Sequence, residues 1–251
     1  MIRENYTRTL LCALLLAAGL LVCGTSSAEE ECPEEELDPE VKTVLTHMEE
    51  ASEGLEDLEA RVTYERSIPL LEEKQKSRGT LKFKKEDLIA LELGKPRNEA
   101  VYANGEKWWV VSHEAKEVEV YEASDEASRE AAFLNFGYGE GYEPLLKDYK
   151  VELTGKEEKE KDDETIVFYR LRFTPRPRKD EDQPPPRYAA VEVGVSSERW
   201  LPHELALHES GGEILHTYTL SKMKLNTGIK DKVFDYDPPG GYTVWHPQQQ
   251  D

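Results

Sequence analysis

Two histidines and a glutamate gather in the stretch HELALH, at His203, Glu204 and His208. A zinc site of the H-E-x-x-H type needs its histidines four positions apart on one face of a helix. Here they are five apart, in a stretch where apolar and polar residues alternate as in a β-strand. Odd spacing on a strand sends the two rings to opposite faces of the sheet, and His216 could join them only through folding. We therefore expect no metal site.

The thiol of Cys32 is the other candidate for chemistry. Cys12 and Cys23 lie in an apolar N-terminal stretch, so Cys32 is the only thiol of the predicted mature chain and can form no internal disulfide. Its surroundings, AEEECPEEELDP, are rich in carboxylates, which disfavour the thiolate that catalysis needs. The chain also has no G-x-S-x-G turn, phosphate loop or Cys-His pair. The sequence predicts no catalytic residue and no cofactor.

The N-terminus is typical of an export signal. Two arginines precede the apolar run Leu10–Val22, which is too short to span a bilayer comfortably. Small residues before Ala28 favour cleavage there, giving a signal peptide at 1–28. The alternative is lipid attachment at Cys23, although the bulky Val22 stands where a lipoprotein box usually has a small residue.

Composition limits the remaining possibilities. The 251 residues are 38% hydrophobic and 33% charged, which suits one globular domain after removal of the signal. The formal net charge of -20 argues against nucleic acid as a partner, because phosphate binding needs clustered Lys and Arg. We expect an acidic leader at 29–37, a single domain at 38–246 and a polar tail at 247–251.

A helix should open the domain. Asp38 can cap it with Pro39 in the first turn, and Gly54 can end it. Its apolar residues recur at helical spacing and predict one buried stripe, made by Val41, Val44, Leu45, Met48 and Leu55.

From Leu58 the apolar period changes to two, which predicts strands. LEARVTYER alternates Leu58, Ala60, Val62 and Tyr64 with polar residues. In GTLKFKK, Leu81 and Phe83 share a face, on which Lys85 also falls, and the next strand has Ile89, Leu91 and Leu93 on one face. Asn104-Gly105 predicts a hairpin turn before KWWVV. In EVEVY, Val118 and Val120 share a face.

A helical insertion is expected at about 124–135. The aromatic- and glycine-rich segment that follows at 136–149 suits either a lid or rim or a plain loop filled with aromatic residues. Strands then resume at KVEL, TIVFYRLRF, YAAVEVGV, PHELAL and EILHTYTLSKMKL. An antiparallel sheet of about ten strands with so few helices must curl, and it then has a concave apolar face.

The ordered motifs VLTHMEEASEGLEDLEARVTY, GTLKFKKEDLIALEL, YANGEKWWVV, VEVY, LLKDYKVEL, LPHELAL, YTLSKMKLN and VFDYDPPGGYTV span 41–244. In this order they resemble the periplasmic outer-membrane lipoprotein-sorting carriers of the LolA/LolB-like superfamily. The resemblance implies an α+β fold, in which an antiparallel sheet of about ten to eleven strands forms an unclosed half β-barrel and helices act as a lid over an apolar cavity.

The resemblance also implies a periplasmic carrier that binds acyl chains of lipoproteins or lipids and passes them towards the outer membrane. An inner-membrane release complex, an outer-membrane acceptor and transient membrane contact would be its partners. One of Trp108 and Trp109 should face the cavity, and we assign Trp109. The expected cavity residues are Leu81, Phe83, Ile89, Leu91, Trp109, Val118 and Val120, and the expected lid residues are Val44, Leu45 and Met48.

Lys85 matches the place of an arginine that in these carriers helps to hold the lid closed. Lysine keeps the charge but lacks the planar fork that bonds several carbonyls at once, which implies a lid that is held less firmly or a different cargo. The alternative is an ordinary lysine at the end of a strand, with no role in a lid. Two other roles stay open. One is an envelope sensor that uses the same fold to bind a protein partner, for which the acidic surface would suit a basic partner. The other is a membrane-anchored acceptor, which requires lipid attachment at Cys23.

Overall fold

The computed structural model describes residues 37–123, 138, 142–177 and 186–247, which fall within one compact unit, Leu37–Asp251. The predicted signal peptide, both possible processing sites, Cys32 and the helical insertion at 124–135 lie outside the described residues. The helical elements are α1 (Pro39–Glu53), η1 (Pro69–Leu71), α3 (Glu143–Asp148) and η3 (Asp231–Val233). None of these described helices has the length and apolar character needed to cross a membrane.

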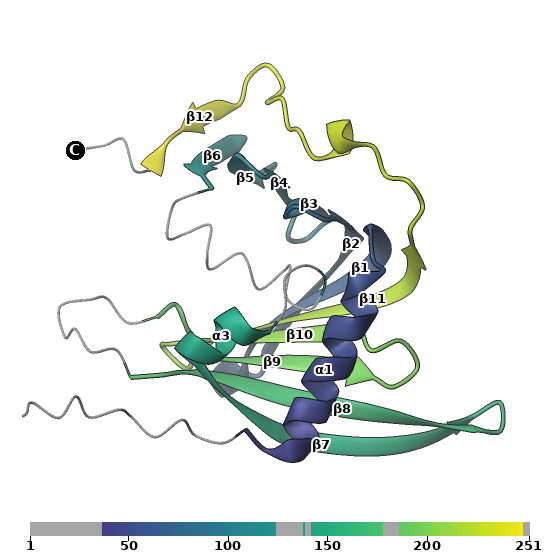
Figure 1. The fold of residues 1–251 in the computed structure, drawn as a ribbon. Coiled ribbons are helices and arrows are strands. Elements are labelled where there is room, and N and C mark those ends of the chain that lie inside the picture. Colours follow the sequence, from purple (N-terminus) through teal and green to yellow (C-terminus); the bar gives the residue numbers. More distant parts are fainter. Residues whose placement is uncertain (1–36, 124–137, 139–141, 178–185, 248–251) are drawn as a thin grey trace, which may run out of the picture. The chain divides into compact units, whose positions relative to one another are not determined.

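The described strands form one sheet (Figure 1). They are β1 (Asp57–Ile68), β2 (Glu73–Lys84), β3 (Leu88–Leu93), β4 (Glu99–Asn104), β5 (Lys107–Ser112), β6 (Glu117–Glu122), β7 (Tyr149–Lys161), β8 (Glu164–Pro175), β9 (Tyr188–Ser196), β10 (Pro202–Glu209), β11 (Leu215–Leu225) and β12 (Thr243–Trp245). Their order is β12-β6-β5-β4-β3-β2-β1-β11-β10-β9-β8-β7, so the sheet starts and ends on strands that do not pair with each other.

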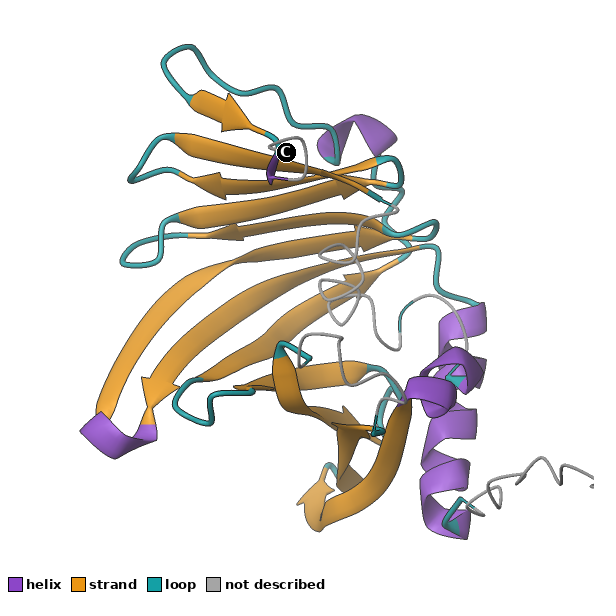
Figure 2. Cartoon of the chain, turned by 90° about the vertical axis from the view of Figure 1, so that its left-hand side faces the viewer, coloured by secondary structure: helices purple, strands orange, loops and turns teal. Residues whose placement is uncertain are grey.

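The predicted fold class is confirmed: the sheet is open and curled, and it carries few helices among the described residues (Figure 2). It has twelve strands instead of about ten to eleven. All neighbouring strands are antiparallel except β12, a short C-terminal strand that pairs with β6 in parallel. β12 has no signal in the sequence, because three residues are too few for a periodic pattern to stand out.

Helix α1 begins and ends where its capping residues predict. Asp38 Oδ1 accepts hydrogen bonds from Glu40 N at 2.8 Å and Val41 N at 3.3 Å, while Pro39 occupies the first turn. The predicted stripe is buried, and its members Val41, Val44, Leu45 and Met48 are each at most 3% exposed. They pack against apolar residues of β7 to β10, in a cluster that includes Val151, Leu171, Phe173, Val191, Val193, Val195 and Leu207.

Strand β1 has the predicted alternation, which defines the two faces of the sheet. Leu58, Ala60, Val62 and Tyr64 are at most 2% exposed. We call their side the inner face. The intervening Arg61 is exposed on the outer face. Because β1 lies at the middle of the sheet order, between β2 and β11, its inner residues join the two halves of the sheet.

The Asn104-Gly105 turn also forms as predicted. Gly105 has φ +85°, a conformation that costs glycine little, and Asn104 Oδ1 accepts hydrogen bonds from Glu106 N and Lys107 N, each at 3.0 Å. Across this turn Ala103 pairs with Trp108, and Tyr102 pairs with Trp109. The turn therefore sets which tryptophan faces which side.

The segment after β11 crosses the outer face of β4 to β6 and ends in β12 (Figure 1). Tyr236 stacks on Tyr102 with ring centroids 4.8 Å apart, and Asn104 Nδ2 donates to Asp235 Oδ1 at 3.0 Å. A small third core cluster forms there, made by Ala100, Val111, Val118 and Val120 with Tyr102, Trp109, Tyr236 and Tyr242 packed against it. This region of the sheet is therefore covered by protein on its outer face.

Candidate functional site

A largely apolar cavity lies on the inner face, between the two halves of the sheet. The space inside it that water-sized molecules can occupy is about 30 Å³, and the hollow as a whole opens to solvent. Its lining comes from β1 to β3 on one side and β9 to β11 on the other: Val62, Leu81, Leu91, Tyr138, Val193, Pro202, Glu204, Leu205, Tyr218 and Leu220.

Pairing explains why these residues meet. In β2 and β3, Leu81 faces Leu91 and Phe83 faces Ile89, so the four predicted residues share one face. Leu81 and Leu91 line the cavity, while Phe83 and Ile89 are fully buried in the core cluster beside it. The register of β2 and β3 therefore brings these four residues to one face of the sheet.

The placement of Trp109, Val118 and Val120 in the same cavity is wrong. Ile89 pairs with Ala103, which pairs with Trp108, so Trp108 is the tryptophan on the inner face, 6% exposed and packed in the cluster of Leu81 and Phe83.

Trp109 points to the other side of the sheet. It pairs with Val120, and Val118 with Val111, all in the outer cluster beneath the C-terminal segment. The second tryptophan is thus covered by the chain's own C-terminal residues.

Half of the cavity was not predicted from the sequence. Val193, Leu205, Tyr218 and Leu220 belong to strands that were recognised, but their inner faces were not assigned. The signal was present, because Val191, Val193 and Val195 recur at a spacing of two, as do Leu205 and Leu207. A local pattern could not place these residues beside Leu81, because β9 to β11 follow β2 by more than a hundred residues.

Tyr138 contributes to the cavity from outside the sheet. It is 3% exposed, its ring centroid lies 5.6 Å from that of Phe83, and its hydroxyl donates to Pro202 O at 2.5 Å. Burial raises the pKa of this phenol well above its usual value, so it remains a hydrogen-bond donor at any physiological pH. The segment for which a lid or rim was predicted therefore supplies a residue of the cavity wall.

The predicted lid residues Val44, Leu45 and Met48 lie on the buried face of α1, next to the cluster that holds Val193. At the other end of the helix, Lys85 Nζ donates to the carbonyl oxygen of Glu53, the last residue of α1, at 2.8 Å. Lys85 Nζ also lies 3.9 Å from Glu56 Oε1. A cation at this position satisfies an otherwise unpaired carbonyl and interacts favourably with the helix dipole.

A second anchor lies just beyond the same helix end. Asn226 Nδ2 donates to Gly54 O at 2.9 Å, and its Oδ1 accepts from Glu56 N at 2.8 Å. Next to it the carboxylate of Asp57, 3% exposed, accepts backbone hydrogen bonds from Thr227 and Gly228, each at 2.7 Å. Burial alone would raise the pKa of Asp57, but the hydrogen bonds outweigh it and hold the pKa below its usual value. The linker between α1 and β1 is thereby tied to the end of β11.

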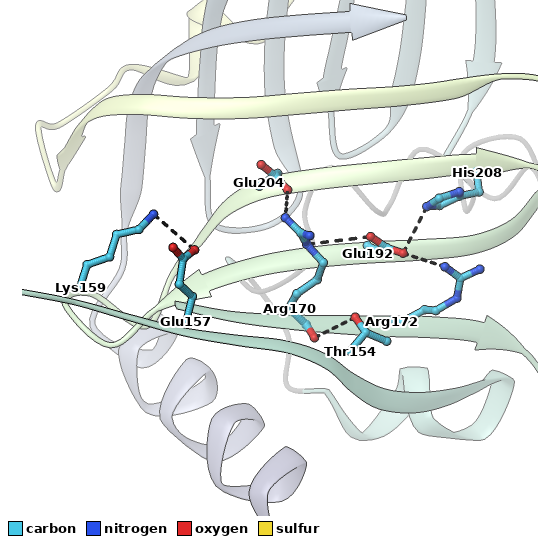
Figure 3. A network of polar contacts seen from close by, with 8 residues as sticks. All are labelled: Thr154, Glu157, Lys159, Arg170, Arg172, Glu192, Glu204 and His208. Carbon is cyan, nitrogen blue, oxygen red and sulfur yellow. Dashed lines mark hydrogen bonds and ion pairs between the residues drawn. The ribbon is translucent and has the colours of Figure 1, made fainter. Parts of the chain in front are cut away.

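The HELALH stretch lies in β10, and most of its polar side chains point away from the cavity. On the outer face Arg172 Nη1 donates to Glu192 Oε1 at 2.7 Å and Arg170 Nη2 to Glu204 Oε1 at 3.0 Å, with His208 Nε2 3.4 Å from the same Glu192 oxygen (Figure 3). This ladder of ion pairs stabilises β8 to β10 without forming a concave site.

The expectation that His203 and His208 lie on opposite faces is wrong. The register shifts between Pro202 and Glu204. As a result, the His203 ring lies edge-on to Phe168, 5.6 Å between centroids, and beside Gly194, on the outer side that also carries His208. Such a bulge reverses the alternation of a strand. In the described part of the chain, no three His, Cys, Asp or Glu side chains gather in a way that could hold a metal ion.

Comparison with solved structures finds remote likenesses of fold. An uncharacterized conserved protein from Thermus thermophilus is 11% identical with a TM-score of 0.48, covering 82% of this chain and 99% of that one. A LolA superfamily protein from Nitrosomonas europaea is 16% identical with a TM-score of 0.39, covering 78% and 97%. The Mycobacterium tuberculosis lipoprotein LppX is 12% identical with a TM-score of 0.40, covering 79% and 100%. At this distance the similarity does not extend to function.

Comparison with sequences is more specific. No curated protein matches the chain. The model of one protein family, described as outer membrane lipoprotein carrier protein LolA, matches residues 69–237, which is more than half of the chain and runs from η1 to the C-terminal segment. The match includes β2 and β3 and β9 to β11, the strands that supply most of the cavity. The chain therefore belongs to the LolA family.

Proposed function

We propose that this protein is a periplasmic carrier, exported with a signal peptide that is removed after Ala28. It holds acyl chains of a lipoprotein or lipid in the inner-face cavity and passes them towards the outer membrane. An inner-membrane complex would load it and an outer-membrane acceptor would unload it. The observation that carries the proposal is the apolar cavity, which both halves of the sheet line and which Tyr138 closes on one side.

The chemistry of the lining suits an acyl chain. Its side chains are mostly aliphatic, with the rings of Tyr138 and Tyr218 among them. Each methylene removed from water contributes roughly 0.8 kcal/mol, so a long chain gains considerable affinity without any directional contact. Binding of this kind depends on the volume of the chain and leaves the head group to contacts outside the apolar lining.

Release requires the cavity to open, and α1 is the element best placed to move. Its buried stripe packs on β7 to β10, while Lys85 and Asn226 hold its C-terminal end through carbonyl oxygens. The Lys85 and Asn226 contacts are polar and partly exposed, so breaking them costs little and loosens the end of the helix, whereas full opening must also expose the buried stripe. We infer that Lys85 is the latch of this lid.

Two exposed apolar side chains support transient contact with a membrane. Leu70 and Leu71 in η1 are 81% and 69% exposed, at the tip of the hairpin of β1 and β2. Two adjacent large apolar side chains exposed to this degree are suited to partial burial in a bilayer interface.

The direct test is native mass spectrometry of the mature protein purified without detergent from its own envelope, followed by solvent extraction. We expect a stoichiometric acylated adduct. Leu81→Trp should abolish it, because the larger side chain fills the cavity from within. Thr80→Trp is the matched control, since Thr80 is exposed on the opposite face of the same strand.

Circular dichroism and the melting temperature verify that both variants are folded. An empty wild-type protein that also fails to bind fluorescent fatty acids would refute the carrier role. A stoichiometric protein partner in that preparation would instead favour the sensor role.

A further inference from the structure

A polar and aromatic cluster lies on the inner face at the end of the strands away from α1. Along β1, the inner-face positions continue from Val62 through Tyr64 to Arg66, and β11 contributes His216 and Tyr218 opposite them. Figure 2 shows η1 at this end of β1 and β2, and α1 beside the other end. The inner face is thus apolar at its centre and polar at one end.

Hydrogen bonds order this cluster. His216 Nε2 lies 2.8 Å from Glu209 Oε1, and His216 Nδ1 lies 2.8 Å from the hydroxyl of Tyr64. Since a carboxylate only accepts, Nε2 carries the proton of the neutral ring, and Tyr64 donates to Nδ1. Burial lowers the pKa of His216 despite the neighbouring Glu209, so the ring is neutral at pH 7. Tyr64 and His216 are therefore fixed in orientation by their own partners.

Two arginines converge on the same place. The Arg97 guanidinium lies 5.7 Å from the centre of the Tyr64 ring, and its backbone N donates to Ser77 Oγ at 2.9 Å. Arg66 is half-buried and pairs across the sheet with His216. The positive field of Arg97, together with that of Arg187, also contributes to the lowered pKa of His216.

The carboxylates nearby are already engaged. Arg97 Nε lies 2.6 Å from Glu99 Oε2, and Glu209 is the partner of His216. Within the described part of the chain, Arg66 has no carboxylate partner. In a protein with a net charge of -20, an uncompensated arginine half-buried on the inner face is available for an anion from outside the chain.

The cavity and this cluster meet at Tyr218. Tyr218 lines the cavity and its ring centroid lies 5.0 Å from that of Tyr64. From Val62, which also lines the cavity, to Arg66 is four residues along β1, or roughly 13 Å at the rise of a strand. A molecule with a flexible chain in the cavity could therefore extend its head past Tyr218 towards Arg66.

We propose that Arg66 and Arg97 bind the anionic head group, a carboxylate or a phosphate, of a single amphiphile whose acyl chain occupies the cavity. This proposal rests on the proposed function, which places the acyl chain in the cavity, and it adds a preference for a charged head group. Arg66 supplies the free guanidinium. Arg97 supplies a second one, held in place by Glu99 and the face of the Tyr64 ring, while Ser77 fixes the Arg97 backbone.

The test compares three ligands with the same palmitoyl chain and different heads. Delipidated mature protein is titrated with palmitate, with palmitoyl lysophosphatidic acid and with neutral monopalmitoylglycerol, each below its micelle-forming concentration, and the Kd is measured by calorimetry. We expect at least one anionic ligand to bind about tenfold more tightly than the neutral one, the gain typical of a hydrogen-bonded charged partner. The tighter of the two anions identifies the head group as carboxylate or phosphate.

Variants connect the preference to the site. Arg66→Gln and Arg97→Lys should lower the ratio of the Kd of monopalmitoylglycerol to that of the preferred anion. Arg61→Gln is the matched control, because Arg61 lies on the same strand with its side chain on the outer face. Equal affinities for all three ligands, or an equal preference in Arg66→Gln and Arg61→Gln, would overturn the head-group site and leave the carrier role intact. Failure of all three ligands to bind would refute the carrier role itself.

Discussion

Replacing Lys85 by methionine tests whether α1 is a lid that can detach. The substitution keeps most of the length of the side chain but removes the hydrogen bond from Nζ to Glu53 O at 2.8 Å and the weaker ion pair with Glu56. The carbonyl at the end of α1 then loses its cation. We expect the helix to open more often and bound lipid to leave faster.

The magnitude follows from the exposure of the contact. The Lys85 side chain is 37% exposed, so the ion pair contributes at the scale of a surface pair, roughly 0.2–1 kcal/mol. The interaction with the helix dipole adds roughly 0.3–1 kcal/mol. Together they give about 1 kcal/mol, which changes the open-to-closed ratio of α1 about fivefold.

Two measurements report on the lid. Hydrogen exchange of the α1 amides follows its opening, and stopped-flow displacement of a bound fluorescent fatty acid follows release. Lys84→Met is the matched control, because it removes the same charge one residue away. The Nζ of Lys84 contacts Asp231 Oδ1 at 2.5 Å and Ile229 O at 3.2 Å in the C-terminal segment.

Lys85→Arg should have the opposite effect to Lys85→Met. The planar guanidinium can bond more than one carbonyl at the helix end, so opening and release should slow. If Lys85→Met and Lys84→Met show the same exchange in α1 and the same release rate, the latch is refuted, and the helix is held by its apolar stripe alone.

Three further predictions concern other parts of the chain. Gly79→Ala should destabilise the fold by about 3 kcal/mol or prevent folding, because the new Cβ would lie 1.8 Å from a backbone carbonyl oxygen of β3; urea unfolding measures it. The lowered pKa of Asp57 stabilises the fold above the unfolded-state value of about 3.9, and this stability should be lost as the pH falls through the folded-state pKa. Asp57→Asn should therefore cost about 2 kcal/mol at pH 7 and flatten the acid limb of a plot of stability against pH. The double change Leu70→Glu and Leu71→Glu should weaken sedimentation with phosphatidylcholine vesicles, whereas Val244→Glu, at an exposed apolar residue elsewhere, should not; equal binding by both variants would exclude η1 as the contact.

Local patterns in the sequence were sufficient for the elements. The spacing of Val41, Val44, Leu45 and Met48 predicted the buried side of α1, and the alternation from Leu58 to Tyr64 predicted the inner face of β1. The Asn104-Gly105 turn followed from the two residue types that tolerate its backbone. These features depend on neighbours a few positions apart, which is why a single sequence contains them.

The faces of β5 and β6 needed information that no single strand carries. Alternation showed that Trp108 and Trp109 must point to opposite sides, but not which of them points inward. That choice depends on the pairs Ile89 with Ala103 and Ala103 with Trp108, and so on the register of three strands. Val118 and Val120 were assigned to the cavity as an apolar pair, yet they are covered by the C-terminal segment on the outer face.

The sequence by itself determined the class of fold, the order of α1 and of strands β1 to β11, and one wall of the cavity, Leu81 and Leu91. Only the tertiary structure decided the opposite wall, since Val193, Leu205 and Tyr218 reach Val62 through the pairing of β1 with β11. It also decided that Tyr64, Arg66, Arg97 and His216 share one end of the inner face. The physical reason is that periodicity is a property of adjacent residues, whereas a site lined by both halves of a curled sheet is created by pairs far apart in the chain.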